Sequence, residues 1–216
     1  MTAGRLPRRA RAAAAALLLL ALSACVRSVE GVPTAAAHPV LPSSAEELEP
    51  LVVPTVPSGL PRLPDAELSP RAGGKSLSDV ASYAADPERE RQVLADYGYR
   101  FGWERFWGHD GGPITGVFVD QFRTRRGAAA YAADLAANDA ELYAGMLRED
   151  PPHLPGGCRL LRVPEPRGRL TGPGVFVWCG HGVFSVGVTA VADSVATASE
   201  EAHAVVLAQL DRLPPS

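Results

Sequence analysis

The chain has 216 residues, of which 46% are hydrophobic and 21% charged, and its 21 basic and 24 acidic side chains give a net charge of −3. Residues 1–24 contain four of the basic residues and no acidic one, so residues 25–216 keep 17 basic and 24 acidic side chains, a net charge of −7. The chain is long enough for one domain. Because residues 25–216 are acidic and contain no basic cluster, they are expected to bind neither nucleic acid nor anionic lipid by charge.

The N-terminal segment has the regions of an export signal. Four arginines form a positive stretch without acidic residues, namely Arg5, Arg8, Arg9 and Arg11. Residues 12–21 are an uninterrupted apolar run, and small residues precede Cys25. The run is shorter than the roughly 20 apolar residues that cross a bilayer, so it is interpreted as a signal peptide, not a membrane span.

The end of this segment resembles the lipobox of bacterial secreted lipoproteins, with the sequence Leu22-Ser23-Ala24-Cys25. The resemblance implies that residues 1–24 are removed and that lipid is attached to Cys25. It also implies an extracytoplasmic location, with the lipid anchoring the protein in the cell membrane. An ordinary cleaved signal peptide, with Cys25 incidental, is the alternative. The heavy use of Ala, Arg, Gly and Pro resembles that of actinobacterial proteins with high-GC genomes.

Residues 25–70 are predicted to be the lipidated N-terminus and a proline-rich tether. Nine prolines fall between residues 26 and 70, and because proline lacks a backbone donor, no helix or central strand is expected there. Short extended segments are expected instead. The alternative is that Leu51–Val53 packs on the domain as an edge strand.

Residues 71–216 are predicted to form a single α+β domain. Capping residues and helical periodicity predict helices at about 78–83, 87–97 and 125–147, and after Asp193-Ser194. Period-two patterns predict strands at 99–107, 114–122, 158–163, 175–179 and 183–189. Short turns between strands require antiparallel pairing. The expected fold is therefore a single antiparallel sheet of about five strands, with helices packed on one face.

Two details of that sheet can be predicted. Placing Trp107 opposite Ile114 sets Trp103 against Phe118 and Tyr99 against Phe122 across the first hairpin. In the second hairpin, one face is expected to hold Phe176, Trp178, Phe184, Val186 and Val188. The predicted domain resembles, in general terms, small extracellular sensor or ligand-binding domains of actinobacterial lipoproteins.

Cys158 and Cys179 are predicted to form a disulfide. They are the two cysteines left after Cys25, and an export signal implies an oxidising compartment. The strands 158–163 and 175–179 place them opposite each other within an error of one residue. The competing arrangement is a zinc site shared with His153 and His181, but the 21-residue spacing of the cysteines is unlike that of structural zinc sites.

The aromatic residues of the first strand are candidates for a ligand site, namely Tyr99, Phe101, Trp103 and Trp107; the alternative is that they form the core face of the strand. No spacing predicts a nucleophile with its base, a metal site or a cofactor. Ser185 is expected inside a strand, and His109 in a glycine-rich turn. The sequence thus favours a non-enzymatic domain that binds a small molecule or an envelope protein. The alternatives are a small secreted hydrolase without a recognisable motif and a structural partner of an envelope protein.

Overall fold

The computed structural model describes residues 40–109 and 111–215, so the predicted signal peptide and Cys25 lie outside the described residues. The elements in chain order are η1 (Glu49–Leu51), η2 (Asp65–Glu67), β1 (Gly73–Lys75), α2 (Leu77–Ala81), α3 (Pro87–Tyr97), β2 (Tyr99–Gly108), β3 (Ile114–Phe122), α4 (Arg125–Tyr143), β4 (Met146–Arg148), β5 (Cys158–Val163), β6 (Gly174–His181), β7 (Phe184–Val191) and α5 (Val195–Arg212). The class is α+β, as predicted.

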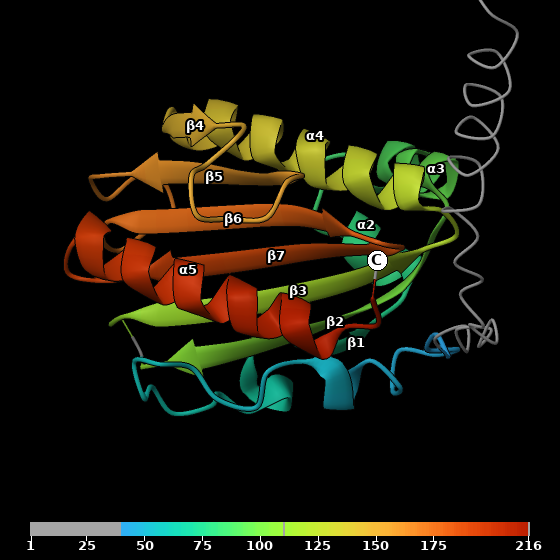
Figure 1. Ribbon diagram of the computed structural model, residues 1–216, viewed down its shortest axis with the longest axis horizontal. Coiled ribbons are helices and arrows are strands. Elements are labelled where there is room, and N and C mark those ends of the chain that lie inside the picture. The colour runs from blue at the N-terminus through green and yellow to red at the C-terminus, as the bar shows by residue number, and fades with distance from the viewer. Residues whose placement is uncertain (1–39, 110, 216) are drawn as a thin grey trace, which may run out of the picture. The chain divides into compact units, whose positions relative to one another are not determined.

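The strands form one antiparallel sheet in the order β1-β2-β3-β7-β6-β5-β4 (Figure 1). The sheet therefore has seven strands, not about five. The two that were not predicted, β1 and β4, have three residues each and lie at the edges. A segment of three residues is too short to show a period-two pattern, which explains why the prediction missed them.

Helices cover both faces of the sheet, whereas the sequence predicted one covered face. In β6, Val175 and Val177 belong to the core cluster under α5, while Phe176 and Trp178 belong to the cluster under α4. Because successive residues of a strand point to opposite faces, α4 and α5 lie on opposite sides of the sheet. Figure 1 shows α5 crossing one of these faces.

The predicted common face of the β6–β7 hairpin is also wrong. The two-residue turn after His181 pairs Cys179 with Val186 and Trp178 with Gly187. An odd-numbered residue of β6 therefore shares a face with an even-numbered residue of β7. Phe176 and Trp178 face α4, whereas Phe184, Val186 and Val188 face α5.

A bulge in β2 accounts for the register of the first hairpin. Tyr99 is opposite Phe122 as predicted, but Trp103 is opposite Val119, one position from the predicted partner. The register shifts between Tyr99 and Phe101, so Arg100 is the extra residue of the bulge. The bulge turns Tyr99 to the α4 face, while Phe101, Trp103 and Trp107 stay on the α5 face.

The predicted helix starts are confirmed, apart from a small shift at the first helix. Asp86, Thr124 and Ser194 each cap a helix through a side-chain oxygen, and Gly98 ends α3 with a φ of 78°. α4 ends at Tyr143 instead of continuing to residue 147, since Ala144 adopts a left-handed φ of 46° and the next residues pair with β5 as β4. In the described part of the chain, no helix combines the length and the apolar character needed to cross a membrane.

The segment before β1 is part of the folded domain, which corrects the prediction of a tether extending to residue 70. Leu48, Val52, Val53 and Val56 are buried in the cluster that includes α5. The prolines of this segment prevent a regular β-ladder. Its backbone groups form hydrogen bonds with buried side chains instead. The Arg105 guanidinium donates to the carbonyls of Val52 and Val53 at 3.3 and 3.1 Å.

Candidate functional site

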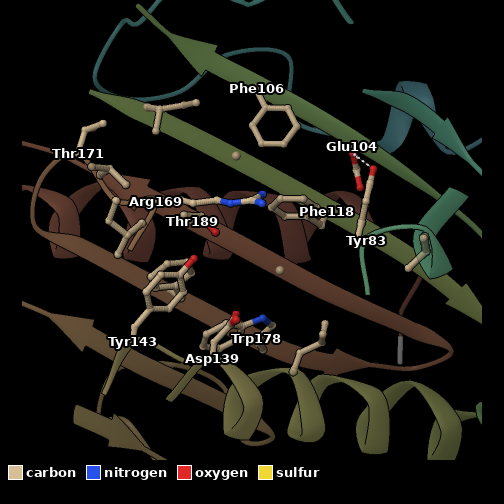
Figure 2. A pocket seen from close by; sticks show the side chains of 18 of the residues that line it. Tyr83, Glu104, Phe106, Phe118, Asp139, Tyr143, Arg169, Thr171, Trp178 and Thr189 are labelled. Atoms are coloured by element: carbon tan, nitrogen blue, oxygen red, sulfur yellow. Dashed lines mark hydrogen bonds between the residues drawn. The ribbon is translucent and has the colours of Figure 1, made fainter. Parts of the chain in front are cut away.

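A cavity of about 670 Å³ opens on the α4 face of the sheet. Its floor comes from β2, β3, β7 and β6, and α4 forms one wall. The segment at the end of α2, the turn after β2 and the loop before β6 complete the rim. Figure 2 shows side chains from these elements converging on one space, with Tyr83 and Glu104 at one side and Tyr143 and Asp139 at the other.

Small residues on β7 create the hollow. Ser185, Gly187 and Thr189 alternate along the strand and face the cavity, since the larger residues between them point to α5. Gly187 is opposite Phe118 on one side and Trp178 on the other. Strands β3 and β6 are therefore two strand spacings apart, roughly 10 Å, with no side chain on the glycine between them.

The part of the cavity that lies over the small residues of β7 forms a trough between β3 and β6. Aromatic rings form both walls of this trough. On the β2–β3 side, the rings of Phe106 and Phe118 meet edge to face, with centroids 5.4 Å apart. On the α4–β6 side, the ring of Phe176 stacks on Tyr143 at 5.1 Å and on Trp178 at 5.6 Å. These walls supply the apolar surface that ligand cavities typically have.

Three carboxylates line the cavity. Glu104 is buried and forms an ion pair with Lys75, with 3.2 Å between Oε2 and Nζ, and it accepts a hydrogen bond from the Tyr83 hydroxyl at 3.0 Å. Burial raises the pKa of Glu104 even though Lys75 opposes that shift. This network joins β1, β2 and the end of α2 at one wall.

Asp120 and Asp139 lie in less polar surroundings. Burial, with a smaller contribution from the Glu104 charge, raises the pKa of Asp120 to about 7. Burial alone raises the pKa of Asp139 to about 6. Both groups therefore change charge within the range of physiological pH.

A single guanidinium reaches the cavity among the described residues. Arg169 belongs to the loop before β6, is itself exposed, and extends over the cavity in Figure 2. The same loop is held to the end of α4 by Arg167, which donates to the Tyr143 carbonyl at 3.3 Å. Arg169 therefore lies at the solvent-exposed rim of the cavity, outside the core.

The four aromatic candidates from the sequence do not line the cavity. Trp103 and Trp107 are buried on the α5 face, where Phe101 packs against the same cluster. Tyr99 is on the α4 face, but it is buried against Phe122, with centroids 5.5 Å apart. All four residues thus contribute to packing.

The predicted disulfide is present. Cys158 is directly opposite Cys179, with Cα atoms 4.0 Å apart and a sulfur–sulfur distance of 2.03 Å. The two histidines of the competing zinc arrangement make other contacts, since a ring nitrogen of His181 lies 3.0 Å from the Pro214 carbonyl oxygen and the backbone carbonyl of His153 lies 3.0 Å from a ring nitrogen of His203. In residues 40–109 and 111–215, no group of three or more His, Cys, Asp or Glu residues is arranged to hold a metal ion.

The cavity was not predicted from the sequence, although the sequence of β7 indicates it. Ser185, Gly187 and Thr189 form a period-two series of small residues opposite a period-two series of large ones. Such a pattern indicates a strand with one tightly packed face and one face that leaves room. Ser185 and His109, both considered as catalytic candidates, line this cavity. Within the described ranges, neither forms a hydrogen bond to Glu104, Asp120 or Asp139.

No protein-family model matches this chain, and no curated protein shows significant similarity to it. Among solved structures, the chain is similar to the extracellular domain of PknH from Mycobacterium tuberculosis. The similarity has 14% sequence identity and a TM-score of 0.42, and it covers 56% of this chain and 70% of that one.

Proposed function

We propose that this chain is a lipid-anchored extracytoplasmic lipoprotein whose domain binds a small organic ligand without catalysing its reaction. The anchor rests on the sequence Leu22-Ser23-Ala24-Cys25. The Cys158–Cys179 disulfide supports an extracytoplasmic location, because structural disulfides persist in oxidising compartments.

The cavity is the observation that carries the binding function. Its volume of about 670 Å³ is in the range of small-molecule sites, and aromatic walls with a few polar groups are typical of them. A core defect would be smaller and closed by its neighbours, because protein interiors leave few voids. Here the trough is open, with α4 on one side and, on the other, Glu104, which forms an ion pair with Lys75.

A non-catalytic domain is the better interpretation of the polar groups. Hydrolysis by a serine needs a base within hydrogen-bond reach of the nucleophile. Ser185 is buried at the second position of β7, whereas His109 lies in the turn after β2, at the end of the sheet where Ile114 pairs with Val191, the last residue of β7. Glu104, a carboxylate that lines the same cavity, already forms an ion pair with Lys75 and accepts a hydrogen bond from Tyr83.

Filling the trough tests the proposal. A Cβ added at Gly187 would lie 3.5 Å from the nearest Phe118 atom, an ordinary contact, so Gly187→Leu should place its side chain in the cavity without distorting the sheet. Gly156→Leu is the matched control, because nothing lies within 4 Å of a Cβ added there.

The measurement is the fluorescence of N-phenyl-1-naphthylamine, a neutral aromatic dye, titrated with the full chain carrying Cys25→Ser to remove the predicted lipid site. Gly187→Leu should weaken dye binding at least about tenfold, the effect of losing about 1.4 kcal/mol. Gly156→Leu should leave it unchanged, and thermal melts should confirm that both variants fold. Equal dye affinity for the parent chain and Gly187→Leu would show that the cavity is not the binding site.

A further inference from the structure

We propose that the ligand of this cavity carries a positive charge on an aromatic or apolar body, as an arylalkyl amine does. This inference rests on the proposed function, because it assigns the ligand class of the same cavity. It is carried by two carboxylates without a cationic partner and by aromatic walls on either side of them.

Among the residues that the structure describes, two of the three carboxylates of the cavity form no ion pair with a protein cation. Glu104 has Lys75 as its partner, with both side chains almost fully buried. In the part of the chain that the structure describes, Asp120 and Asp139 have no Lys, Arg or His nitrogen within 4.0 Å. A carboxylate held in an apolar cavity favours a cationic partner, because ion pairing offsets the loss of water.

The groups that face these carboxylates do not supply such a partner. Asp120 is faced by the Tyr99 and Tyr131 hydroxyls and by Glu104. Asp139 is near the phenol of Tyr143. These groups are neutral or acidic. The cation nearest to them is Arg169, whose charge acts on Tyr143, but its side chain is exposed and makes no ion pair with Asp139 within 4.0 Å.

The aromatic walls suit the same charge. Phe118 and Trp178 lie on either side of Gly187 in one row across the sheet. A ring face attracts a cation within about 6 Å of its centre, and tryptophan is the strongest such partner. A ligand cation over Gly187 can therefore interact with both walls, with Asp120 and Asp139 at the two sides of the cavity.

Arg169 is consistent with this selectivity and sharpens its test. The exposed guanidinium of Arg169 extends over the trough in Figure 2, so the cavity accommodates a cation from the protein itself. A ligand cation has to displace that like charge. Removing it by Arg169→Gln should therefore strengthen the binding of cationic ligands and leave neutral ones unaffected.

Three probes that share one ring system separate charge from hydrophobic binding: 1-naphthalenemethylamine, 1-naphthalenemethanol and 1-naphthoate. Calorimetric titration of the full chain carrying Cys25→Ser at pH 8 should give an affinity for the amine at least about tenfold above that for the alcohol, with the carboxylate weakest. Asp120→Asn and Asp139→Asn should each lower the amine affinity several-fold and leave the alcohol affinity unchanged. Arg169→Gln should raise the amine affinity.

The outcomes distinguish this inference from the proposed function. Equal affinities for the amine and the alcohol would overturn the charge selectivity, while the binding cavity would stand if Gly187→Leu abolishes both. A preference for 1-naphthoate that Arg169→Gln removes would also overturn it, since it would assign an anionic ligand. If the neutral dye binds in the cavity and none of the three probes does, the inference is likewise wrong.

Discussion

Gln209 of α5 forms a hydrogen bond with Val53, which is 156 positions away in the chain. Its side-chain oxygen accepts from the Val53 backbone N–H at 3.0 Å. The amide nitrogen of the same side chain donates to the Leu51 carbonyl at 3.0 Å. Glu201, which lies eight residues before Gln209 in α5, accepts a hydrogen bond from the Ser58 backbone N–H at 3.0 Å. The helix therefore satisfies backbone groups of a segment that has no strand partner at these positions.

Removing the Gln209 amide should destabilise the domain. Gln209→Leu introduces an apolar side chain of similar size and leaves the Val53 N–H without its acceptor. An unsatisfied buried group costs about 1–3 kcal/mol. Urea unfolding followed by tryptophan fluorescence measures the loss. Gln92→Leu, on the exposed side of α3, is the matched control and should change the midpoint little. A Gln209→Leu midpoint equal to that of the parent chain would mean that the N-terminal segment does not depend on this contact.

Reducing the Cys158–Cys179 disulfide should lower the free energy of unfolding. The bridge closes a loop with a sequence separation of 21, for which the chain-entropy model predicts roughly 3 kcal/mol. Urea unfolding with and without a phosphine reductant measures the difference. The Cys158→Ala/Cys179→Ala double variant should be insensitive to the reductant. A reductant effect of equal size in that variant would exclude the disulfide as its origin.

The raised pKa of Asp120, about 7, predicts a specific pH dependence of stability. In the unfolded chain this carboxyl loses its proton near pH 4, whereas in the folded chain it holds the proton until about pH 7. Folding therefore binds a proton between these values, and its contribution to stability is largest below pH 4 and falls as the pH rises to 7. Asp139, with a pKa of about 6, acts in the same direction.

Asp120→Asn should remove that dependence. Relative to the parent chain, the variant should gain up to about 3 kcal/mol between pH 4.5 and pH 8, because each pH unit between the unfolded and the folded pKa corresponds to about 1.4 kcal/mol. Thermal melts across this range give the comparison. Asp96→Asn, exposed on α3, should run parallel to the parent chain. Parallel curves for Asp120→Asn as well would show that Asp120 ionises normally in the folded domain.

Cys25→Ser should release the protein from the membrane. The sequence before Cys25 predicts a diacylglyceryl group on its thiol, and two acyl chains are what stable anchoring generally requires. The expected result is a shift of the protein from the membrane pellet to the medium, measured by immunoblotting after a carbonate wash. Ser23→Ala keeps a small residue before the cut and should leave the protein in the membrane. Retention of the Cys25→Ser protein would place the anchor elsewhere.

The sequence by itself determined the longer helices and strands and several of their ends. Asp86, Thr124 and Ser194 mark helix starts because capping involves only the next few residues. The pairing of Cys158 with Cys179 could also be predicted, because both strands and the loop between them are short. Signals of this kind act over a few residues and can be read locally.

The tertiary structure decided which face of the sheet each residue lies on and where the cavity forms. A shift of one residue exchanges the two faces of a strand. The bulge at Arg100 therefore places Tyr99 on the α4 face, and the two-residue turn after His181 places Trp178 on the face opposite to Phe184. Leu48, Val52, Val53 and Val56 are part of the core, and the backbone groups of Val52 and Val53 form hydrogen bonds with Arg105 and Gln209, which are distant in sequence. The cavity exists because α4 and the segment at the end of α2 lie at two sides of the small residues of β7. The distance between two elements leaves no pattern in the sequence of either one.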